Sequence, residues 1–260
     1  MELITSRRNP LVARFRALHQ PKGRREQGLL LLEGTHQIQE LIRLGLVPCQ
    51  VLATPAWIDR HADLQAAHRL PIQPVGSEVL AAVASTDHPD GVVASLKRDA
   101  LPVARGEGHF VLALDQLQDP GNLGTLLRTA LAAGVNEVWL AGGADPLQPK
   151  VLRASAGAAL ALPLLRLLDR QALLPLEQAR SRGQQLVATL VHPSAQPYWQ
   201  LDWSCPTVLL LGNEGAGLAP ELAALANQRV TIPHSAAVES LNVAVAAAPL
   251  LLERWRQQGG

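Results

Sequence analysis

The hydrophobic pattern after residue 109 predicts a parallel β-sheet. Continuous apolar runs, most of them separated by segments with helical spacing, occupy residues 110–115, 137–141, 186–190, 207–211 and 229–232. Strands that are apolar on both faces are typical of a parallel sheet that helices cover on both sides. We therefore expect an α/β domain in this part of the chain.

The first hundred residues show a shorter alternation. Strand-like runs occur at 28–33, 50–53 and 91–96, and residues 36–46 have helical spacing. The stretch 97–109 is polar and contains one proline and two glycines, which favours a linker. We expect a small α/β accessory domain at 1–100, a linker at 101–108 and the main domain at 109–260.

The loop after the run 110–115 begins with the turn signal Asp-Pro-Gly at 119–121 and leads into a helix. Asn122 is a natural N-cap for this helix, and its apolar stripe consists of Leu123, Leu126, Leu127, Ala130, Leu131 and Gly134. Arg128 shares a different face with Gly121 and Gly124. A guanidinium with open space before it can clamp a phosphate or a reacting oxygen, although an ordinary surface arginine fits the same pattern.

The loop "GNEGAG" at 212–217 follows another apolar run. A carboxylate repels phosphate, so Glu214 indicates a ligand other than a nucleotide phosphate, unless it merely caps the next helix. In "PHSAAVESLN" at 233–242, Ser240 is a plausible N-cap for the last helix, and Leu241, Val245 and Ala248 would begin its buried stripe. Asn242 would then lie in the first turn and need a partner for its amide, unless it is a second capping residue.

The composition bears on where the protein works and on whether it binds a metal. The hydrophobic fraction of 48% suffices for a sizeable core, and the formal net charge is only +1. The two cysteines form neither a disulfide framework nor a metal-binding spacing, and the first residues lack a signal-peptide pattern. We therefore expect a cytoplasmic protein with no bound metal and no membrane anchor.

A local basic segment stands out against this near-neutral background. Residues 1–28 contain seven lysines and arginines against two glutamates. Such a segment can engage nucleic-acid phosphates, and a solvated N-terminal helix is the alternative. Lys150 and Arg153 form a second, smaller basic pair, which either contacts a phosphate backbone or lies at an ordinary surface.

The stretches "NLGTLLRTALAAG", "LLLGNEGAGL" and "IPHSAAVESLNVAVAAA" resemble, in order and spacing, the three motifs of the SpoU-type (TrmH-like) RNA ribose 2′-O-methyltransferases. The N-terminal region is similar to the RNA-binding accessory domain of members that modify ribosomal RNA. The resemblance covers nearly the whole chain. It implies a SPOUT-type parallel sheet with a deep trefoil knot, S-adenosylmethionine as cofactor and a homodimer whose sites are completed across the interface.

The resemblance also assigns roles by motif position. It implies a catalytic cluster of Asn122, Arg128, Glu214, Ser240 and Asn242. It implies cofactor contacts from Thr189, Leu190, Gly212, Asn213, Gly217, Ile232 and Leu241. As RNA contacts we predict the basic residues Arg7, Arg8, Arg14, Arg16, Arg24, Arg25, Lys150 and Arg153. Arg128 would act either as a base or as a clamp on phosphate and alkoxide.

The implied reaction is methyl transfer to a ribose 2′-hydroxyl of structured RNA, with 23S ribosomal RNA expected and DNA not expected as substrate. A transfer-RNA methyltransferase and a noncatalytic RNA-binding or ribosome-assembly protein on the same fold are the alternatives. A dinucleotide-dependent dehydrogenase or a serine hydrolase is disfavoured, because the chain has neither the glycine fingerprint of the first nor the nucleophile elbow of the second. Pro249 departs from the expected pattern, since proline interrupts helices.

Overall fold

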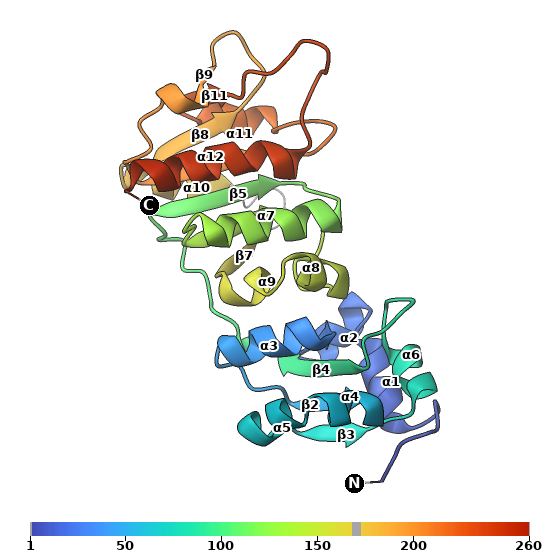
Figure 1. Ribbon diagram of the computed structural model, residues 1–260. Helices are drawn as coiled ribbons and strands as arrows, with labels where there is room; N and C mark the ends of the chain where they lie inside the picture. Colours follow the sequence, from blue (N-terminus) through green and yellow to red (C-terminus); the bar gives the residue numbers. More distant parts are fainter. Residues whose placement is uncertain (1, 168–172, 260) are drawn as a thin grey trace. The chain divides into compact units, whose positions relative to one another are not determined.

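A computed structural model describes residues 2–167 and 173–259 (Figure 1). The chain forms two compact units. The first unit comprises the residues up to Leu101 together with Pro146–Leu160, and the second comprises Pro102–Asp145 and Ala161–Gly260.

The first unit is built around a four-stranded mixed sheet of order β1-β4-β2-β3, in which only β2 and β3 are parallel neighbours. Its strands are β1 (Leu29–Glu33), β2 (Gln50–Ala53), β3 (Ile72–Pro74) and β4 (Val92–Lys97). Its helices are α1 (Pro10–Ala17), α2 (Pro21–Gln27), α3 (Thr35–Arg43), α4 (Pro55–Arg60), α5 (Ala62–His68), α6 (Ser77–Val83), α8 (Pro149–Ala154) and α9 (Ala158–Ala161), with a 3₁₀ turn at Arg98–Ala100. The predicted strands at 28–33, 50–53 and 91–96 are confirmed, whereas the short β3 was not predicted.

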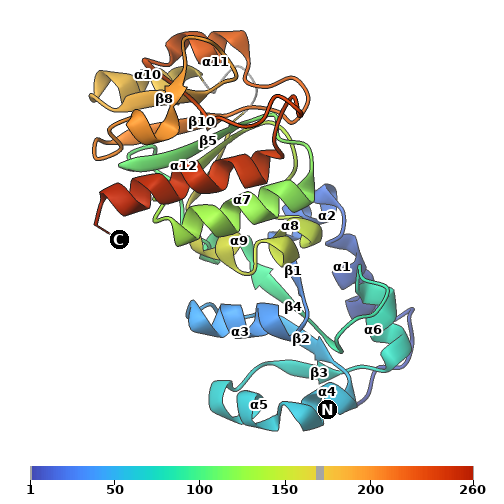
Figure 2. The same cartoon turned by 45° about the horizontal axis from the view of Figure 1, so that its top comes forward.

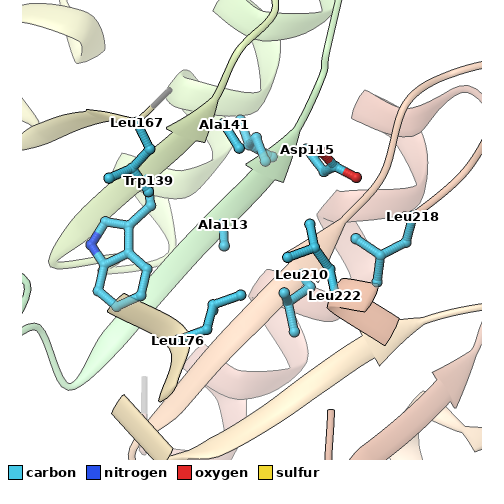
Figure 3. Close-up of a pocket in the computed structure, with 10 residues that line it drawn as sticks. Ala113, Asp115, Trp139, Ala141, Leu167, Leu176, Leu210, Leu218 and Leu222 are labelled. Atoms are coloured by element: carbon cyan, nitrogen blue, oxygen red, sulfur yellow. The ribbon is translucent and has the colours of Figure 1, made fainter. Parts of the chain in front are cut away.

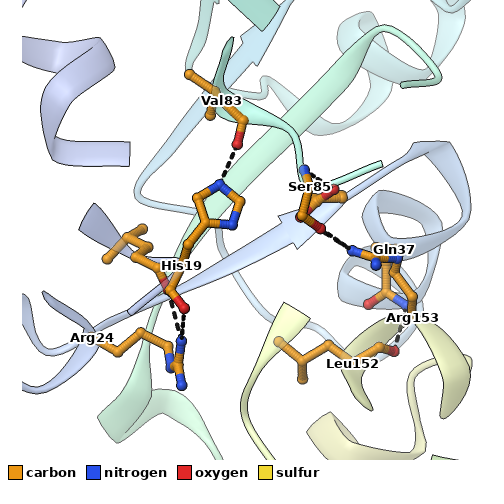
Figure 4. Close-up of polar contacts among 9 residues, drawn as sticks. His19, Arg24, Gln37, Val83, Ser85, Leu152 and Arg153 are labelled. Atoms are coloured by element: carbon orange, nitrogen blue, oxygen red, sulfur yellow. Dashed lines mark hydrogen bonds and ion pairs between the residues drawn. The ribbon is translucent and has the colours of Figure 1, made fainter. Parts of the chain in front are cut away.

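A polar cluster explains why residues 146–160 belong to the first unit (Figure 4). The carboxylate of Glu33 is buried, and it accepts hydrogen bonds from the main-chain N–H and the hydroxyl of Ser85. The guanidinium of Arg153 lies 3.2 Å from this carboxylate and donates to the Ser85 hydroxyl at 2.6 Å. The buried Gln37 side chain donates to the carbonyl of Leu152. The sequence predicts this segment in the main domain. The difference arises because tertiary hydrogen bonds of this kind leave no local pattern.

The second unit is a seven-stranded, wholly parallel sheet of order β7-β6-β5-β10-β8-β11-β9. Its strands are β5 (Phe110–Asp115), β6 (Glu137–Ala141), β7 (Leu164–Leu167), β8 (Gln185–Thr189), β9 (Gln196–Pro197), β10 (Thr207–Leu211) and β11 (Gln228–Thr231). Its helices are α7 (Pro120–Ala132), α10 (Leu173–Ser181), α11 (Pro220–Leu225) and α12 (Val243–Gln257), with a 3₁₀ turn at Tyr198–Gln200. The parallel α/β prediction is confirmed, and β7 and β9 are additions to it.

Helices cover both faces of this sheet. Helices α7 and α12 lie side by side on one face (Figures 1 and 2), where the Arg254 guanidinium of α12 stacks 4.2 Å above the Phe110 ring. On the other face, Leu176 of α10 and Leu222 of α11 pack into a core with alternate residues of β5, β6, β8 and β10. This two-sided burial accounts for the continuous apolar runs.

The predicted linker is fastened to the second unit. The buried carboxylate of Glu137 accepts the main-chain N–H groups of Arg105 and Gly106 at 3.0 and 2.9 Å. In addition, Val103 forms a parallel bridge with Leu164. Residues 102–107 are therefore part of the second unit rather than a free connection.

Two helix caps differ from the sequence prediction. The cap of α7 is Asp119, whose side chain accepts the N–H of Asn122, so that Asn122 lies inside the first turn. The cap of α12 is Asn242, which accepts the N–H groups of Ala244 and Val245, and Ser240 lies outside the helix. Several residues suit a cap position equally well by type, and the tertiary position of the chain selects one of them.

The buried stripe of α7 is confirmed at Leu123, Leu126, Leu127 and Ala130, whereas that of α12 is shifted from the prediction. Leu131, Leu241 and Val245 were expected to be buried, but their side chains are 37%, 36% and 62% exposed. The buried residues of α12 are Ala244, Ala247, Leu250 and Leu251. Pro249 does not end this helix, which continues to Gln257.

The last turn of α12 supports a prediction about pH. The Glu253 carboxylate accepts hydrogen bonds from Arg256 and from Gln257. The Arg256 guanidinium is the main cause that holds the pKa of Glu253 at about 2, against an ordinary value of 4.5. A lowered folded-state pKa stabilises the fold above pH 4.5, and this contribution is lost as the pH falls towards 2.

We therefore expect Glu253→Gln to destabilise the protein at pH 6, and we expect this difference to shrink between pH 4.5 and pH 2. Thermal unfolding of both proteins across this range measures it. Glu221→Gln, on the exposed first turn of α11, is the control. A difference in unfolding temperature that stayed constant down to pH 2 would contradict the assignment.

Candidate active site

The loop after β10 closes on itself through main-chain contacts. Asn213 and Gly217 exchange two main-chain hydrogen bonds of 2.9 and 3.0 Å. At Gly212 a Cβ atom would lie only 2.1 Å from the carbonyl carbon of Gly217 and the nitrogen of Leu218. Glycine is therefore required at 212 by this close approach of two main-chain segments.

This loop forms one wall of an open pocket of about 450 Å³ at the carboxyl ends of β8, β10 and β11. The other walls come from the ends of β8 and β11 and from the loop that precedes α12. All seven residues predicted to contact the cofactor line this pocket, namely Thr189, Leu190, Gly212, Asn213, Gly217, Ile232 and Leu241. Ligands of parallel sheets bind at this edge.

The lining of the pocket has a distinctive charge pattern. It contains the carboxylates of Glu214 and Glu239 and, among the described residues, no lysine or arginine. The hydroxyl of Thr189 is buried in the wall without a hydrogen-bond partner among the described residues. The pocket is therefore suited to a cationic ligand that can also form hydrogen bonds, and not to a phosphate.

Glu214 joins the loop after β10 to the start of α7. Its carboxylate accepts the main-chain N–H groups of Gln118 and Asp119 at 3.3 and 3.2 Å. It also accepts the side-chain amide of Asn122 at 3.2 Å. Glu214 thus binds the segment that leads into α7, whose N-cap is Asp119. It does not cap the following helix α11, which was the alternative on sequence.

These contacts set the ionisation of Glu214. Partial burial raises the pKa of the carboxyl group, but hydrogen bonds from its own main-chain N–H, from Asn122 and from the N–H groups of Asp119 and Gln118 lower it by more. The net direction is a lowered pKa. Glu214 is therefore ionised at neutral pH and acts only as a hydrogen-bond acceptor.

An ionised Glu214 orients a chain of two amides. Because the Asn122 amide nitrogen donates to Glu214, its carbonyl oxygen is directed to Asn242, whose amide nitrogen donates to it at 2.9 Å. The oxygen of Asn242 caps α12. Three of the five predicted catalytic residues are thus connected by hydrogen bonds, although they are far apart in sequence.

The other two predicted catalytic residues are not part of this chain of hydrogen bonds. Ser240 is exposed and lines the pocket. Arg128 is exposed on α7, and its side chain makes no hydrogen bond or ion pair with any residue in the described part of the chain. A guanidinium without an acidic partner remains available for an external anion.

The pocket also contains residues that were not singled out as contacts on sequence. His234 and Glu239 line it, and His234 Nδ1 lies 2.7 Å from the carbonyl oxygen of Ile232. His234 belongs to the loop 233–242, and a lone histidine after a strand is more often structural than catalytic. Across residues 2–167 and 173–259 no cluster of histidine, cysteine and acidic side chains could hold a metal ion.

The structure separates the predicted RNA-contacting residues into two groups. Arg24 is buried and donates to the carbonyls of Leu18 and His19, and Arg153 is bound to Glu33 and Ser85 (Figure 4). These two guanidinium groups stabilise the first unit, and we omit them from the proposed RNA surface. The remaining residues have exposed side chains: Arg7, Arg8, Arg14, Arg16, Arg25 and Lys150.

Two protein-family models match this sequence. The sequence model described as the SpoU rRNA Methylase family matches residues 109–252, and that of the MRM3-like substrate binding domain matches residues 9–94. In the described part of the chain no helix has the length and apolar character needed to cross a bilayer.

Relatives match over almost the whole chain. An uncharacterized tRNA/rRNA methyltransferase of Synechocystis is 46% identical over 98% of this chain and 94% of its own length. The 23S rRNA (guanosine(2553)-2′-O)-methyltransferase of Bacillus subtilis is 32% identical over 96% of this chain and 98% of its own. The AdoMet-bound rRNA methyltransferase of Sinorhizobium meliloti has a TM-score of 0.83 and 32% identity, covering 98% of this chain and 97% of its own. The chain therefore belongs to the SpoU rRNA methylase family of RNA 2′-O-methyltransferases, whose methyl donor is S-adenosylmethionine.

Proposed function

We propose that the protein methylates a ribose 2′-hydroxyl of ribosomal RNA, and of 23S ribosomal RNA in particular, in the cytoplasm. The observation that carries this proposal is the hydrogen-bonded chain Glu214–Asn122–Asn242 beside a pocket that lacks lysine and arginine. The chain of hydrogen bonds fixes polar groups for a substrate, and the pocket suits a cation. Together they favour an enzyme over the alternative of a noncatalytic RNA-binding protein.

The residues of the pocket fit S-adenosylmethionine. Its sulfonium is a cation, which the carboxylates of Glu214 and Glu239 do not repel. Its adenosine hydroxyls and amine can form hydrogen bonds with main-chain groups of the loop 212–217. The Thr189 hydroxyl, which has no hydrogen-bond partner in the described part of the chain, offers one further hydrogen bond. When bound, the sulfonium supplies an electrophilic methyl group. The trefoil knot around this pocket stays a prediction from the resemblance.

The side chains around the pocket would act on the ribose and its phosphate. A guanidinium stays protonated at any physiological pH, so we assign Arg128 to hold the adjacent phosphate and stabilise the negative charge that develops on the 2′-oxygen. Asn242 and Ser240 would orient the ribose. Glu214 would act through Asn122 to keep the Asn242 amide in one orientation, so its role is positioning.

We further propose a homodimer in which Arg128 serves the site of the other subunit. Apolar side chains are exposed on the α7 and α12 surface, at Leu131, Val245, Leu252 and Trp255. Exposed apolar side chains that gather on adjacent helices mark an interface. Arg128 is exposed on the same helix α7, and a role in the other subunit accounts for its lack of a partner among the residues that the structure describes.

The substrate can be identified by transfer of labelled methyl from S-adenosylmethionine to total RNA from a strain that lacks the gene, followed by ribose-methylation mapping. We expect label at one nucleotide of 23S ribosomal RNA. Label in transfer RNA would retain the chemistry and overturn the substrate assignment. No label and no cofactor binding would favour the noncatalytic RNA-binding protein.

The exposed N-terminal arginines support a prediction about salt dependence. Replacing Arg7, Arg8, Arg14 and Arg16 by glutamine should weaken RNA binding and reduce the slope of log affinity against log salt by about one for each arginine that contacts phosphate. Filter binding over a salt series measures the slope. The control replaces Arg60 and Arg69, which are exposed on the first unit outside the basic segment. An unchanged slope would show that the segment is only a solvated helix.

A further inference from the structure

Asp115 is the last residue of β5 and its carboxylate is nearly buried. Figure 3 shows it at the edge of a small apolar pocket, whose lining includes Ala113, Leu210, Leu218 and Leu222. The volume of this pocket is about 20 Å³. A carboxylate in such surroundings is costly unless it is hydrogen-bonded. Its position at a strand end is shared with many structural residues, so no role for it could be predicted from the sequence.

The carboxylate of Asp115 accepts the main-chain N–H of Ala219 at 2.9 Å. Ala219 directly follows Leu218, whose nitrogen lies against Gly212 where the loop closes on itself. At the other end of the loop, the Asn213 amide donates to the carbonyl of Gln116 at 2.7 Å. The residues at the end of β5 therefore hold both ends of the loop that forms a wall of the cofactor pocket.

We propose that Asp115 is a positioning residue for the cofactor: its bond to Ala219 fixes the carboxyl-terminal end of the loop 212–218 in the shape that binds S-adenosylmethionine. The inference rests on the proposed function, in which this loop contacts the cofactor. A charged acceptor strengthens a hydrogen bond to a main-chain N–H, and the apolar surroundings strengthen it further. The bond thus organises the loop before the cofactor arrives, which reduces the cost of ordering it on binding.

The test is a double-mutant cycle on the hydrogen bond between Ala219 and Asp115. Asp115→Ala removes the acceptor, and Ala219→Pro removes the donor at a backbone φ of −55° that proline accepts. The proline Cδ takes the place of the donated hydrogen and crowds the Asp115 carboxylate, a contact that the double variant lacks. Calorimetry with S-adenosylmethionine should show about tenfold weaker binding for each variant. The double variant should also be about tenfold weaker, because both changes break the same bond. Effects that multiply to about a hundredfold, or unchanged affinities, would overturn the proposal.

Two further variants separate positioning from general stability. In Asp115→Leu the leucine side chain has the same branched shape as aspartate and suits the apolar lining, so this variant should fold even if the alanine variant does not. Its affinity for the cofactor should nevertheless be lower than that of the wild type. Asp202→Ala removes a carboxylate that accepts the N–H of Ser204, away from the pocket lining. It should lower the unfolding temperature without changing cofactor affinity, and an equal loss of affinity would count against the proposal.

Kinetics supply an independent readout. In Asp115→Ala the KM for S-adenosylmethionine should rise about tenfold, with kcat at saturating cofactor changed by less than about twofold. A fall in kcat alone would contradict a positioning role. Wild-type protein that failed to bind S-adenosylmethionine would instead disprove the proposed function, so the two failures are distinguishable.

Discussion

Arg128→Ala should reduce methyl transfer by about a thousandfold or more while leaving affinity for S-adenosylmethionine within about twofold. The loss is expected because a guanidinium aimed at developing negative charge is worth several kcal/mol in a transition state. The cofactor should still bind, because Arg128 is absent from the lining of the pocket. Single-turnover transfer of labelled methyl and calorimetry measure the two quantities.

Arg180→Ala is the matched control, because Arg180 is also an exposed arginine on a helix of the second unit but lies on α10. It should retain wild-type activity. Arg128→Lys should recover little activity, since an ammonium cannot reproduce the planar, two-pronged contact of a guanidinium with phosphate. If Arg128→Ala lost cofactor affinity instead, Arg128 would belong to the cofactor site and the assigned role would be wrong.

The same variant tests whether the site is shared between subunits. Arg128→Ala and Gly212→Ala should each be inactive alone, and denaturing and refolding them together in equal amounts should restore about a quarter of wild-type activity. Half of the dimers would then contain both variants, and each of these would have one intact site. Absence of any recovery, with mixed dimers shown to form, would place Arg128 in the site of its own subunit.

The second large effect is expected at Gly212. Gly212→Ala would place a methyl group 2.1 Å from two main-chain atoms of the facing loop segment, far inside van der Waals contact. The loop cannot relieve this by moving a flexible side chain, so its closure must open. We expect affinity for S-adenosylmethionine to fall at least about a hundredfold, which corresponds to about 2.7 kcal/mol.

Neighbouring glycines provide graded controls within the same loop. At Gly215 the nearest atom to an added Cβ is the Asn213 side-chain oxygen at 3.6 Å, so Gly215→Ala should bind the cofactor normally. Gly217 has open space but a φ of +71°, so Gly217→Ala should show a smaller loss from backbone strain alone. Equal affinities for all three variants would mean that this loop does not form the cofactor site.

Much of the fold could be predicted from the sequence because its signals are local. Strands that are apolar on both faces, such as 110–115 and 207–211, revealed the parallel sheet, since burial on two sides leaves no polar alternation. The loops of the candidate site could be predicted in the same way, because ligands gather at the carboxyl ends of such strands, whereas the residues assigned to the cofactor came from the resemblance to the family. The seven predicted cofactor residues, which lie in separate loops, line one pocket for this reason.

Only the tertiary structure decided which residues cap the helices and which groups bind the arginine side chains. Asn122 and Ser240 suit a helix cap by type, yet Asp119 and Asn242 occupy those positions. Arg24 and Arg153 belong by composition to basic patches, yet carbonyls and a buried carboxylate bind their guanidinium groups.

The sequence by itself therefore determined the class of sheet, the loops that form the site and the chemistry those loops contain. Only the tertiary structure decided that Glu214, Asn122 and Asn242 form one chain of hydrogen bonds, and that Asp115 holds the loop at Ala219. Hydrophobic burial acts on runs of residues, so it leaves a periodic pattern in the sequence. A hydrogen bond joins two particular atoms across about a hundred residues, and nothing in the local sequence records its partner.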